Sequence, residues 1–166
     1  EYPSWLFPVK QGATTIWERW DGIKADGSFQ NPGMNSFNHY AYGAIGEWMV
    51  RFVAGLDVDP ANPGFARAVV APKLGGGFTS AQASFESING VYAVDWKLAD
   101  GVMHLSVTAP ANGGVEVNLP GAVLAQVTEG GRPIAAAPEI REARQIEDGV
   151  QLTVGAGHYS FAYPRK

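Results

Sequence analysis

The chain has 166 residues, 46% of them hydrophobic and 17% charged, which is enough to bury a core in one domain or in two small ones. Its 12 basic and 16 acidic residues give a net charge of −4 without a basic cluster, so neither nucleic acid nor an anionic membrane is expected as a partner. The absence of cysteine excludes disulfides and thiolate metal sites but assigns no compartment, so the localisation is unknown.

No metal site, cofactor site or membrane span is expected. The three histidines, His39, His104 and His158, do not stand at metal-ligand spacing, and no apolar run is long enough to cross a bilayer. The chain begins Glu1-Tyr2-Pro3, without an initiator methionine or a signal-peptide pattern. We therefore expect it to be a piece of a longer protein.

The first chemically informative stretch is residues 12–22, GATTIWERWDG, which places Glu18 between Trp17 and Trp20. Aromatic rings pack on the apolar faces of sugars, and a carboxylate handles a proton or binds a hydroxyl group, so this composition suits a carbohydrate site. The alternative is a half-buried structural turn in which Glu18 pairs with Arg19 or another arginine, because structural ion pairs produce similar clusters.

Residues 35–56 are predicted to form one helix of about five turns. Apolar residues recur three and four positions apart, Asn35 or Ser36 can cap its start, and Gly55 marks its end. The interior Gly43 and Gly46 suggest close packing against a neighbour. The apolar face is too wide for an isolated helix, so we expect Phe37, Ile45, Trp48, Met49 and Phe52 to be exposed if neighbouring helices are absent.

His39 is predicted to lie in the first turn of this helix, at the end that should face the same way as the loop around Glu18. A neutral imidazole there can donate a hydrogen bond to a sugar hydroxyl or orient a water molecule. The alternative is a histidine that caps the helix or packs in a core.

Residues 57–64, DVDPANPG, are predicted to form a linker, after which the hydrophobic period changes from helical to strand-like. Short alternating runs follow, with hairpin turns expected at Asn89-Gly90 and Asp100-Gly101. Residues 123–129 are weakly strand-like, and residues 135–145 are ambiguous. Short strands at this spacing indicate an antiparallel sandwich.

Several motifs resemble, in order and with familiar spacing, the inverting α-L-rhamnosidases of glycoside hydrolase family 78. They are PSW at residues 3–5, GATTIWERWDG at 12–22, FNHYAYG at 37–43 and APKLGGGFTSAQASFESINGVYAVDWK at 71–97. The resemblance covers most of the chain and weakens after about Pro120.

The resemblance implies an α+β fragment. Residues 1–57 would supply the last helices and the catalytic-base loop of an (α/α)6 barrel, and residues 58–166 a C-terminal antiparallel β-sandwich domain. The parent would remove terminal α-L-rhamnose from glycosides or polysaccharides. Glu18 matches the catalytic base, Trp17, Trp20 and His39 would contact the substrate, and the general acid would lie upstream.

Other interpretations stay open. The parent could be another hydrolase or a lyase built on an α-toroid, or the chain could be a non-catalytic carbohydrate-binding or structural β-domain with a helical lead-in. With the acid upstream, the isolated chain should be inactive and should self-associate or bind the remainder of its parent. If the acid lies within the chain, Asp21 and Asp26 are the first carboxylates to consider.

Overall fold

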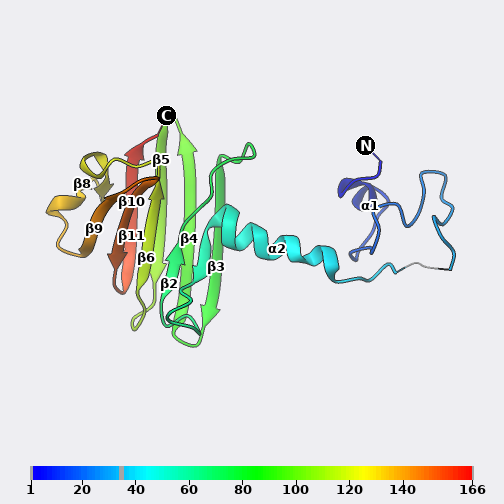
Figure 1. Cartoon of the computed structure of the whole chain (residues 1–166), viewed down its shortest axis with the longest axis horizontal. Helices are drawn as coiled ribbons and strands as arrows, with labels where there is room; N and C mark the ends of the chain where they lie inside the picture. The colour runs from blue at the N-terminus through cyan, green and yellow to red at the C-terminus, as the bar shows by residue number, and fades with distance from the viewer. Residues whose placement is uncertain (1, 34–35, 166) are drawn as a thin grey trace. The chain divides into compact units, whose positions relative to one another are not determined.

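A computed structural model describes residues 2–33 and 36–165. The chain divides into two compact units, residues 1–47 and residues 48–166. Figure 1 shows the order of the elements along the chain.

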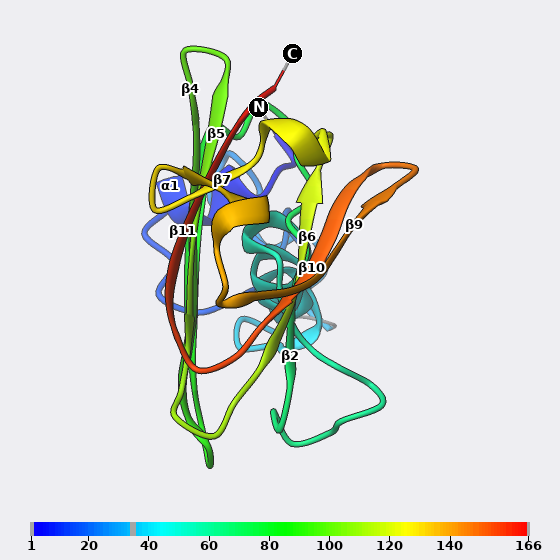
Figure 2. The ribbon, with the colours of Figure 1, turned by 90° about the vertical axis from the view of Figure 1, so that its left-hand side faces the viewer.

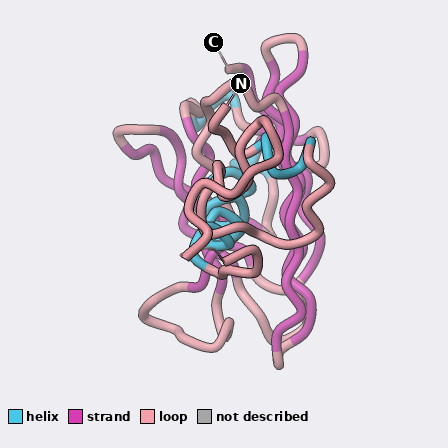
Figure 3. Tube along the Cα trace, turned by 90° about the vertical axis from the view of Figure 1, so that its right-hand side faces the viewer, coloured by secondary structure: helices cyan, strands magenta, loops and turns pink. Residues whose placement is uncertain are grey.

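The first unit is mostly loop (Figure 3), with one short helix, α1 (Leu6–Lys10), near its start. Its interior is aromatic: Phe7 and Trp17 are buried, and the Trp17 ring meets the Phe37 ring edge-on with centroids 5.2 Å apart. This contact leaves Phe37 half-buried, so the expectation that Phe37 is exposed is wrong. An isolated bridge between Ile23 and Phe29 closes the loop that follows Gly22.

The predicted helix over residues 35–56 begins later than expected. Helical structure comprises a 3-10 turn η1 (Ala41–Ala44), an α-helical turn α2 (Ile45–Trp48) and a π-helical segment η2 (Met49–Ala54). Ser36 does not cap the helix, because helical structure starts only at Ala41, and the prediction for Asn35 lies outside the described residues. The physical reason is that the backbone N–H of His39 donates to the carbonyl oxygen of Ile16, which fixes this stretch against the preceding loop.

The predicted end of the helix is confirmed. Gly55 adopts a left-handed φ of 88° as the C-cap, and its N–H donates to the carbonyl oxygen of Val50, the spacing of a π-helical turn. A side chain at residue 55 would place Cβ 2.3 Å from the backbone nitrogen of Pro72, so the close approach requires glycine. Gly46, in contrast, has nothing within 4 Å of an added Cβ, so no close neighbour explains it among the described residues.

The second unit is a sandwich of two sheets (Figure 2). One sheet has the order β1 (Leu56–Val58), β2 (Ala68–Val70), β6 (Val115–Pro120), β10 (Gly149–Val154), β9 (Ile140–Ile146). The other has the order β3 (Ser80–Ser87), β4 (Gly90–Ala99), β5 (Val102–Ala109), β11 (Gly157–Pro164), β7 (Thr128–Glu129), β8 (Arg132–Pro133). All pairs of described strands are antiparallel except β2 and β6, which are parallel. The predicted α+β class with a β-sandwich is confirmed.

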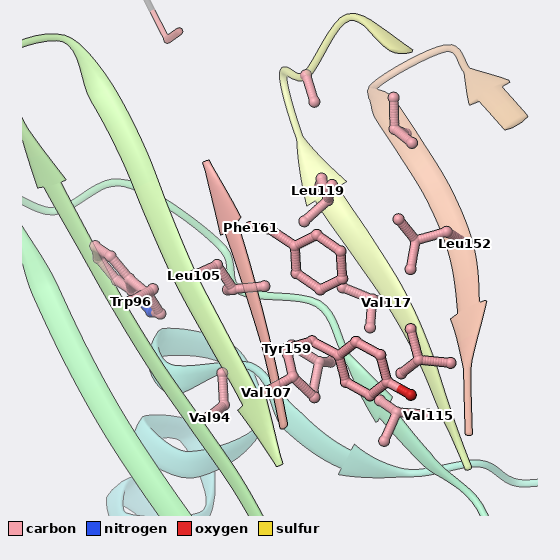
Figure 4. Close-up of a cluster of buried hydrophobic side chains, with 14 of the residues drawn as sticks. Val94, Trp96, Leu105, Val107, Val115, Val117, Leu119, Leu152, Tyr159 and Phe161 are labelled. Carbon is pink, nitrogen blue, oxygen red and sulfur yellow. The ribbon is translucent and has the colours of Figure 1, made fainter. Parts of the chain in front are cut away.

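The core of the sandwich follows from alternation along the strands. On β4, Tyr92, Val94 and Trp96 are buried, and their neighbours face outward. Figure 4 shows buried side chains of β5 and β11, including Leu105 and Phe161, facing Val117 and Leu119 of the opposite sheet. Burying such aliphatic and aromatic side chains contributes roughly 1.5–3 kcal/mol each, which makes this face the main source of stability.

The two predicted hairpin turns have different outcomes. Asp100 and Gly101 both have positive φ, 51° and 72°, and join β4 to β5 as predicted. The other turn is shifted by one residue: Ser87 pairs with Gly90, so Ile88 and Asn89 form the loop. Asn89 is held there because its side-chain amide donates to the carbonyl oxygen of Phe65 at 2.9 Å.

In three further stretches the structure either differs from the expectation or resolves an ambiguity. The predicted linker over residues 57–64 begins inside β1, where Asp57 pairs with Val69. The weakly strand-like stretch 123–129 forms a 3-10 turn η3 (Leu124–Gln126) and then β7. The ambiguous stretch 135–145 resolves into a 3-10 turn η4 (Ile134–Ala136) and β9.

Candidate active site

The candidate site in the first unit is built by two segments that lie side by side. The N–H of Glu18 donates to the carbonyl oxygen of Ser36 at 2.9 Å, and the N–H of His39 donates to the carbonyl oxygen of Ile16 at 2.8 Å. The Thr15 hydroxyl donates to the carbonyl oxygen of Phe37 between them. Backbone bonding therefore brings the segments that carry Glu18 and His39 together.

Glu18 is half-buried on the first of these two hydrogen-bonded segments. Among residues 2–33 and 36–165, no salt bridge or side-chain hydrogen bond engages its carboxylate. The neighbouring guanidinium of Arg19 donates instead to the side-chain oxygen of Gln30 at 2.8 Å. The described contacts therefore give no support to the alternative in which Glu18 is the acid of a structural ion pair.

The two tryptophans that flank Glu18 have different environments. Trp17 is only 7% exposed and packs edge-on against Phe37, so its position favours support of the loop over stacking on a sugar. Trp20 is half-buried, and its ring stacks on Tyr42 with centroids 5.4 Å apart and an interplanar angle of 26°. Trp5 lies against both rings, with centroids 5.9 Å from Trp20 and 5.3 Å from Tyr42.

Sequence reasoning did not assign a site role to Trp5 or Tyr42. Both are partly exposed, at 39% and 36%, and with Trp20 they form an aromatic cluster beside the Glu18 loop. The indole nitrogen of Trp20 is buried and has no hydrogen-bond partner among the described residues. The signal available in the sequence was only that Trp5 and Tyr42 fall in the PSW and FNHYAYG motifs.

His39 lies before the helix and not in its first turn, because helical structure starts at Ala41. Its Nδ1 accepts a hydrogen bond from the backbone N–H of Ala41 at 3.2 Å, and its ring stacks on Tyr40. A neutral ring that accepts at Nδ1 carries its proton on Nε2, an assignment that follows from the hydrogen bond. His39 therefore caps the 3-10 turn and keeps its Nε2–H as a donor.

The two carboxylates nearest Glu18 in sequence were the candidates for a second catalytic group. Asp26 accepts hydrogen bonds from the hydroxyl and the backbone N–H of Ser28, at 2.7 Å and 2.9 Å. These bonds to Ser28 lower the pKa of Asp26, which favours a turn-forming carboxylate over a protonated acid. Asp21 is half-buried next to the turn at Gly22.

A metal-binding cluster and a membrane-spanning helix are both absent from the described part of the chain. No group of three or more histidine, cysteine, aspartate or glutamate side chains could hold a metal ion there. None of the helices within residues 2–33 and 36–165 has the length and apolar composition needed to span a bilayer.

Two family models match consecutive parts of the sequence. The bacterial α-L-rhamnosidase six-hairpin glycosidase domain matches residues 1–53, and the bacterial α-L-rhamnosidase C-terminal domain matches residues 55–132. Together they span both the Glu18 loop and most of the sandwich.

Curated relatives agree with these family matches. An α-L-rhamnosidase of Streptomyces avermitilis is 46% identical over 119 residues, which cover 72% of this chain and 11% of that protein. One of Formosa agariphila is 40% identical over 119 residues, covering 72% of this chain and 13% of that protein. The matched residues thus span only about an eighth of the length of these relatives.

Solved structures cover nearly the whole chain. The Streptomyces avermitilis α-L-rhamnosidase complexed with L-rhamnose superposes with a TM-score of 0.81 at 39% identity, over 98% of this chain and 15% of that one. The α-L-rhamnosidase from Dictyoglumus thermophilum gives a TM-score of 0.80 at 28% identity, over 99% of this chain and 18% of that one.

Proposed function

Because the chain belongs to the bacterial α-L-rhamnosidase family, of which it represents a C-terminal part, we propose that its parent hydrolyses terminal α-L-rhamnosyl groups with inversion at the anomeric carbon. Residues 1–57 complete the catalytic domain in this proposal, and residues 58–166 form the C-terminal β-domain. The substrate is a rhamnose-containing glycoside or polysaccharide. No cofactor takes part.

The observation that carries the proposal is the backbone hydrogen bonding between the segments that contain Glu18 and His39. The bond from Glu18 to Ser36 and the bond from His39 to Ile16 hold a carboxylate and an imidazole on two neighbouring loop segments. Glu18 is half-buried, and its carboxylate is not engaged by described side chains. A carboxylate in this position is available to accept a proton from water.

Glu18 acts as the general base. Inverting glycosidases use two carboxyl groups about 6.5–9.5 Å apart, so that a water molecule fits between the base and the anomeric carbon. Glu18 removes a proton from that water as its oxygen attacks the anomeric carbon. The bond to the leaving oxygen breaks on the opposite face, where a second carboxyl group supplies the proton.

That second carboxyl group belongs to a part of the parent outside these residues. Asp26 is committed to its turn with Ser28, and its lowered pKa does not suit a general acid. The isolated chain should therefore show no rhamnosidase activity. It should also self-associate or bind the rest of its parent, because Trp48, Met49 and Phe52 expose 45%, 51% and 41% of their surfaces.

His39 and the aromatic residues position the sugar. With Nδ1 occupied by Ala41, the Nε2–H of His39 donates to a rhamnose hydroxyl. Trp20 contacts an apolar face or edge of the substrate, supported by Trp5 and Tyr42. Trp17 supports the loop through packing, since its ring is buried against Phe37.

The substitution Glu18→Gln in the full-length parent distinguishes this catalytic role from the alternative of a non-catalytic carbohydrate-binding module. The amide cannot take a proton from water, so kcat on p-nitrophenyl α-L-rhamnoside should fall by orders of magnitude while KM changes little. Asp26→Asn is the matched control and should retain activity. Full activity in the Glu18→Gln variant would overturn the role of Glu18.

The stereochemical course tests inversion independently. Proton NMR of the first-formed sugar should show β-rhamnose, which then equilibrates with the α anomer. Early release of α-rhamnose would indicate a retaining mechanism and a different role for Glu18.

A further inference from the structure

Three of the four sheet edges in the second unit are protected against pairing with another strand. Edge strands β1 and β8 are only three and two residues long, and β8 contains Pro133. Edge strand β9 carries Arg141 and Arg144, and its register with β10 shifts near Glu142, which has a φ of 52°. Shortness, proline, charge and bulges are the usual devices that blunt a sheet edge.

The fourth edge, β3, has none of these devices along most of its length. It has eight residues, SAQASFES, which pair with β4 in an unbroken register from Ser80 to Ser87. It contains no proline and no lysine, and its one charge, Glu86, stands next to its end. A long regular edge of this kind is a template for another strand.

The free backbone groups of β3 follow from its register. The N–H of Leu98 donates to the carbonyl oxygen of Thr79, so the hydrogen-bonded pairs with β4 fall on the odd-numbered residues of this strand. The N–H and C=O groups of the even-numbered residues consequently point away from β4. Those residues are all exposed: Ser80, Gln82, Ser84 and Glu86.

We propose that β3 pairs in antiparallel fashion with β3 of a second copy of this chain, about a two-fold axis at Ala83. In this register Ser80 lies opposite Glu86 of the copy, and Gln82 lies opposite Ser84. All four outward-facing residues then form backbone hydrogen bonds. Moving the axis to Ser84 would engage only three of them, so the axis at Ala83 is the better match.

The side chains are self-complementary in this register. The two Glu86 carboxylates lie at opposite ends of the pair and each faces a serine, so no like charges meet. On the inner face, Phe85 lies opposite Ala81 of the copy, which leaves room for its ring. Phe85 is 45% exposed on the described chain, so pairing also covers apolar surface.

The absence of native cysteine allows a direct test of this register. Ala83 would face itself across a non-hydrogen-bonded pair with Cα atoms about 4.5 Å apart, a separation that a disulfide spans. Ala83→Cys should therefore form a covalent dimer under mild oxidation with diamide. Ala81→Cys is the control, because its two copies would lie roughly 14 Å apart at about 3.4 Å per residue. Equal cross-linking of both variants, or none of Ala83→Cys, would overturn the proposal.

Charge exchange tests the interface without a covalent bond. A double variant with lysine at both 82 and 84 places like charges opposite each other, and so does a double variant with glutamate at both positions. Each should dimerise at least tenfold more weakly than the native chain, as measured by sedimentation velocity. An equimolar mixture of the two should restore the dimer. Two outcomes would refute pairing through β3. One is dimerisation that persists in both variants, which association through Trp48, Met49 and Phe52 would allow. The other is a mixture that stays monomeric.

Discussion

The indole N–H of Trp96 donates a buried hydrogen bond to the carbonyl oxygen of Val53 at 2.9 Å. Val53 lies in the last turn of η2, and Trp96 lies on β4, so this bond joins the helix to the inner face of the six-stranded sheet. Both side chains are buried, at 5% and 1% exposure. The carbonyl oxygen of a π-helical turn is thereby satisfied by the sandwich.

Trp96→Phe should weaken the second unit through this bond. The substitution keeps an aromatic ring but leaves the Val53 carbonyl oxygen buried without its donor, which costs about 1–3 kcal/mol. Urea unfolding followed by far-ultraviolet circular dichroism measures the change. Trp48→Phe is the matched control: Trp48 is 45% exposed, and we expect its change to stay within about 0.5 kcal/mol. Equal effects of the two substitutions would contradict the role of the bond.

Gly55→Ala should destabilise the junction between η2 and β1. The left-handed φ of 88° costs a non-glycine residue about 1–3 kcal/mol, and the overlap of Cβ with Pro72 adds to this cost. Gly46→Ala provides the contrast, because a helical glycine with open space around it should gain roughly 0.5–1 kcal/mol from alanine. Thermal unfolding of both variants separates the two cases, and a neutral Gly55→Ala would show that the backbone relaxes there.

The stability of the sandwich should fall above about pH 10, the ordinary pKa of tyrosine. Burial raises the pKa of Tyr163, and burial also raises the pKa of Tyr92 and Tyr159. Because the folded state resists deprotonation, stability is constant below the unfolded pKa and declines as the pH rises past it.

Tyr163→Phe isolates this contribution. It removes the hydrogen bond to the Pro120 carbonyl oxygen at 3.2 Å and should cost about 1 kcal/mol at neutral pH. Above pH 10 the native chain loses stability that the variant keeps, so the difference between them should narrow. A difference that stays constant from pH 8 to about 11 would contradict the raised pKa of Tyr163.

The strands were predictable because their signal is local. The alternation of Tyr92, Val94 and Trp96 specifies one buried face, and Asp100-Gly101 specifies a two-residue turn. The shift of the other turn to Ile88 and Asn89 was not predictable, since it depends on a hydrogen bond to Phe65, far away in the sequence. Strand β7 likewise depends on a distant partner, since it pairs with Phe161 and Ala162 as well as with the neighbouring β8.

In the candidate site, too, local features were predictable from the sequence and tertiary contacts were not. The sequence marks Glu18 as a carboxylate between aromatic residues, but it assigns His39 to a helix that starts only at Ala41. The bond from His39 to Ile16 that displaces the helix start is non-local. The burial of Trp17 against Phe37 and the stacking of Trp20 on Tyr42 are also tertiary contacts, which composition alone does not distinguish.

The central claim, that Glu18 serves as the base, is tested most directly by rescue of a Glu18→Ala variant of the full-length parent with azide. Azide is already an anionic nucleophile and needs no proton removed, so it bypasses a missing base but not a missing acid. We expect azide to restore turnover of a rhamnoside by the Glu18→Ala variant, without stimulating the native enzyme, and to give β-rhamnosyl azide as the product. Failure of azide to restore turnover, or formation of the α-azide, would contradict the assignment of Glu18 as the base of an inverting hydrolase.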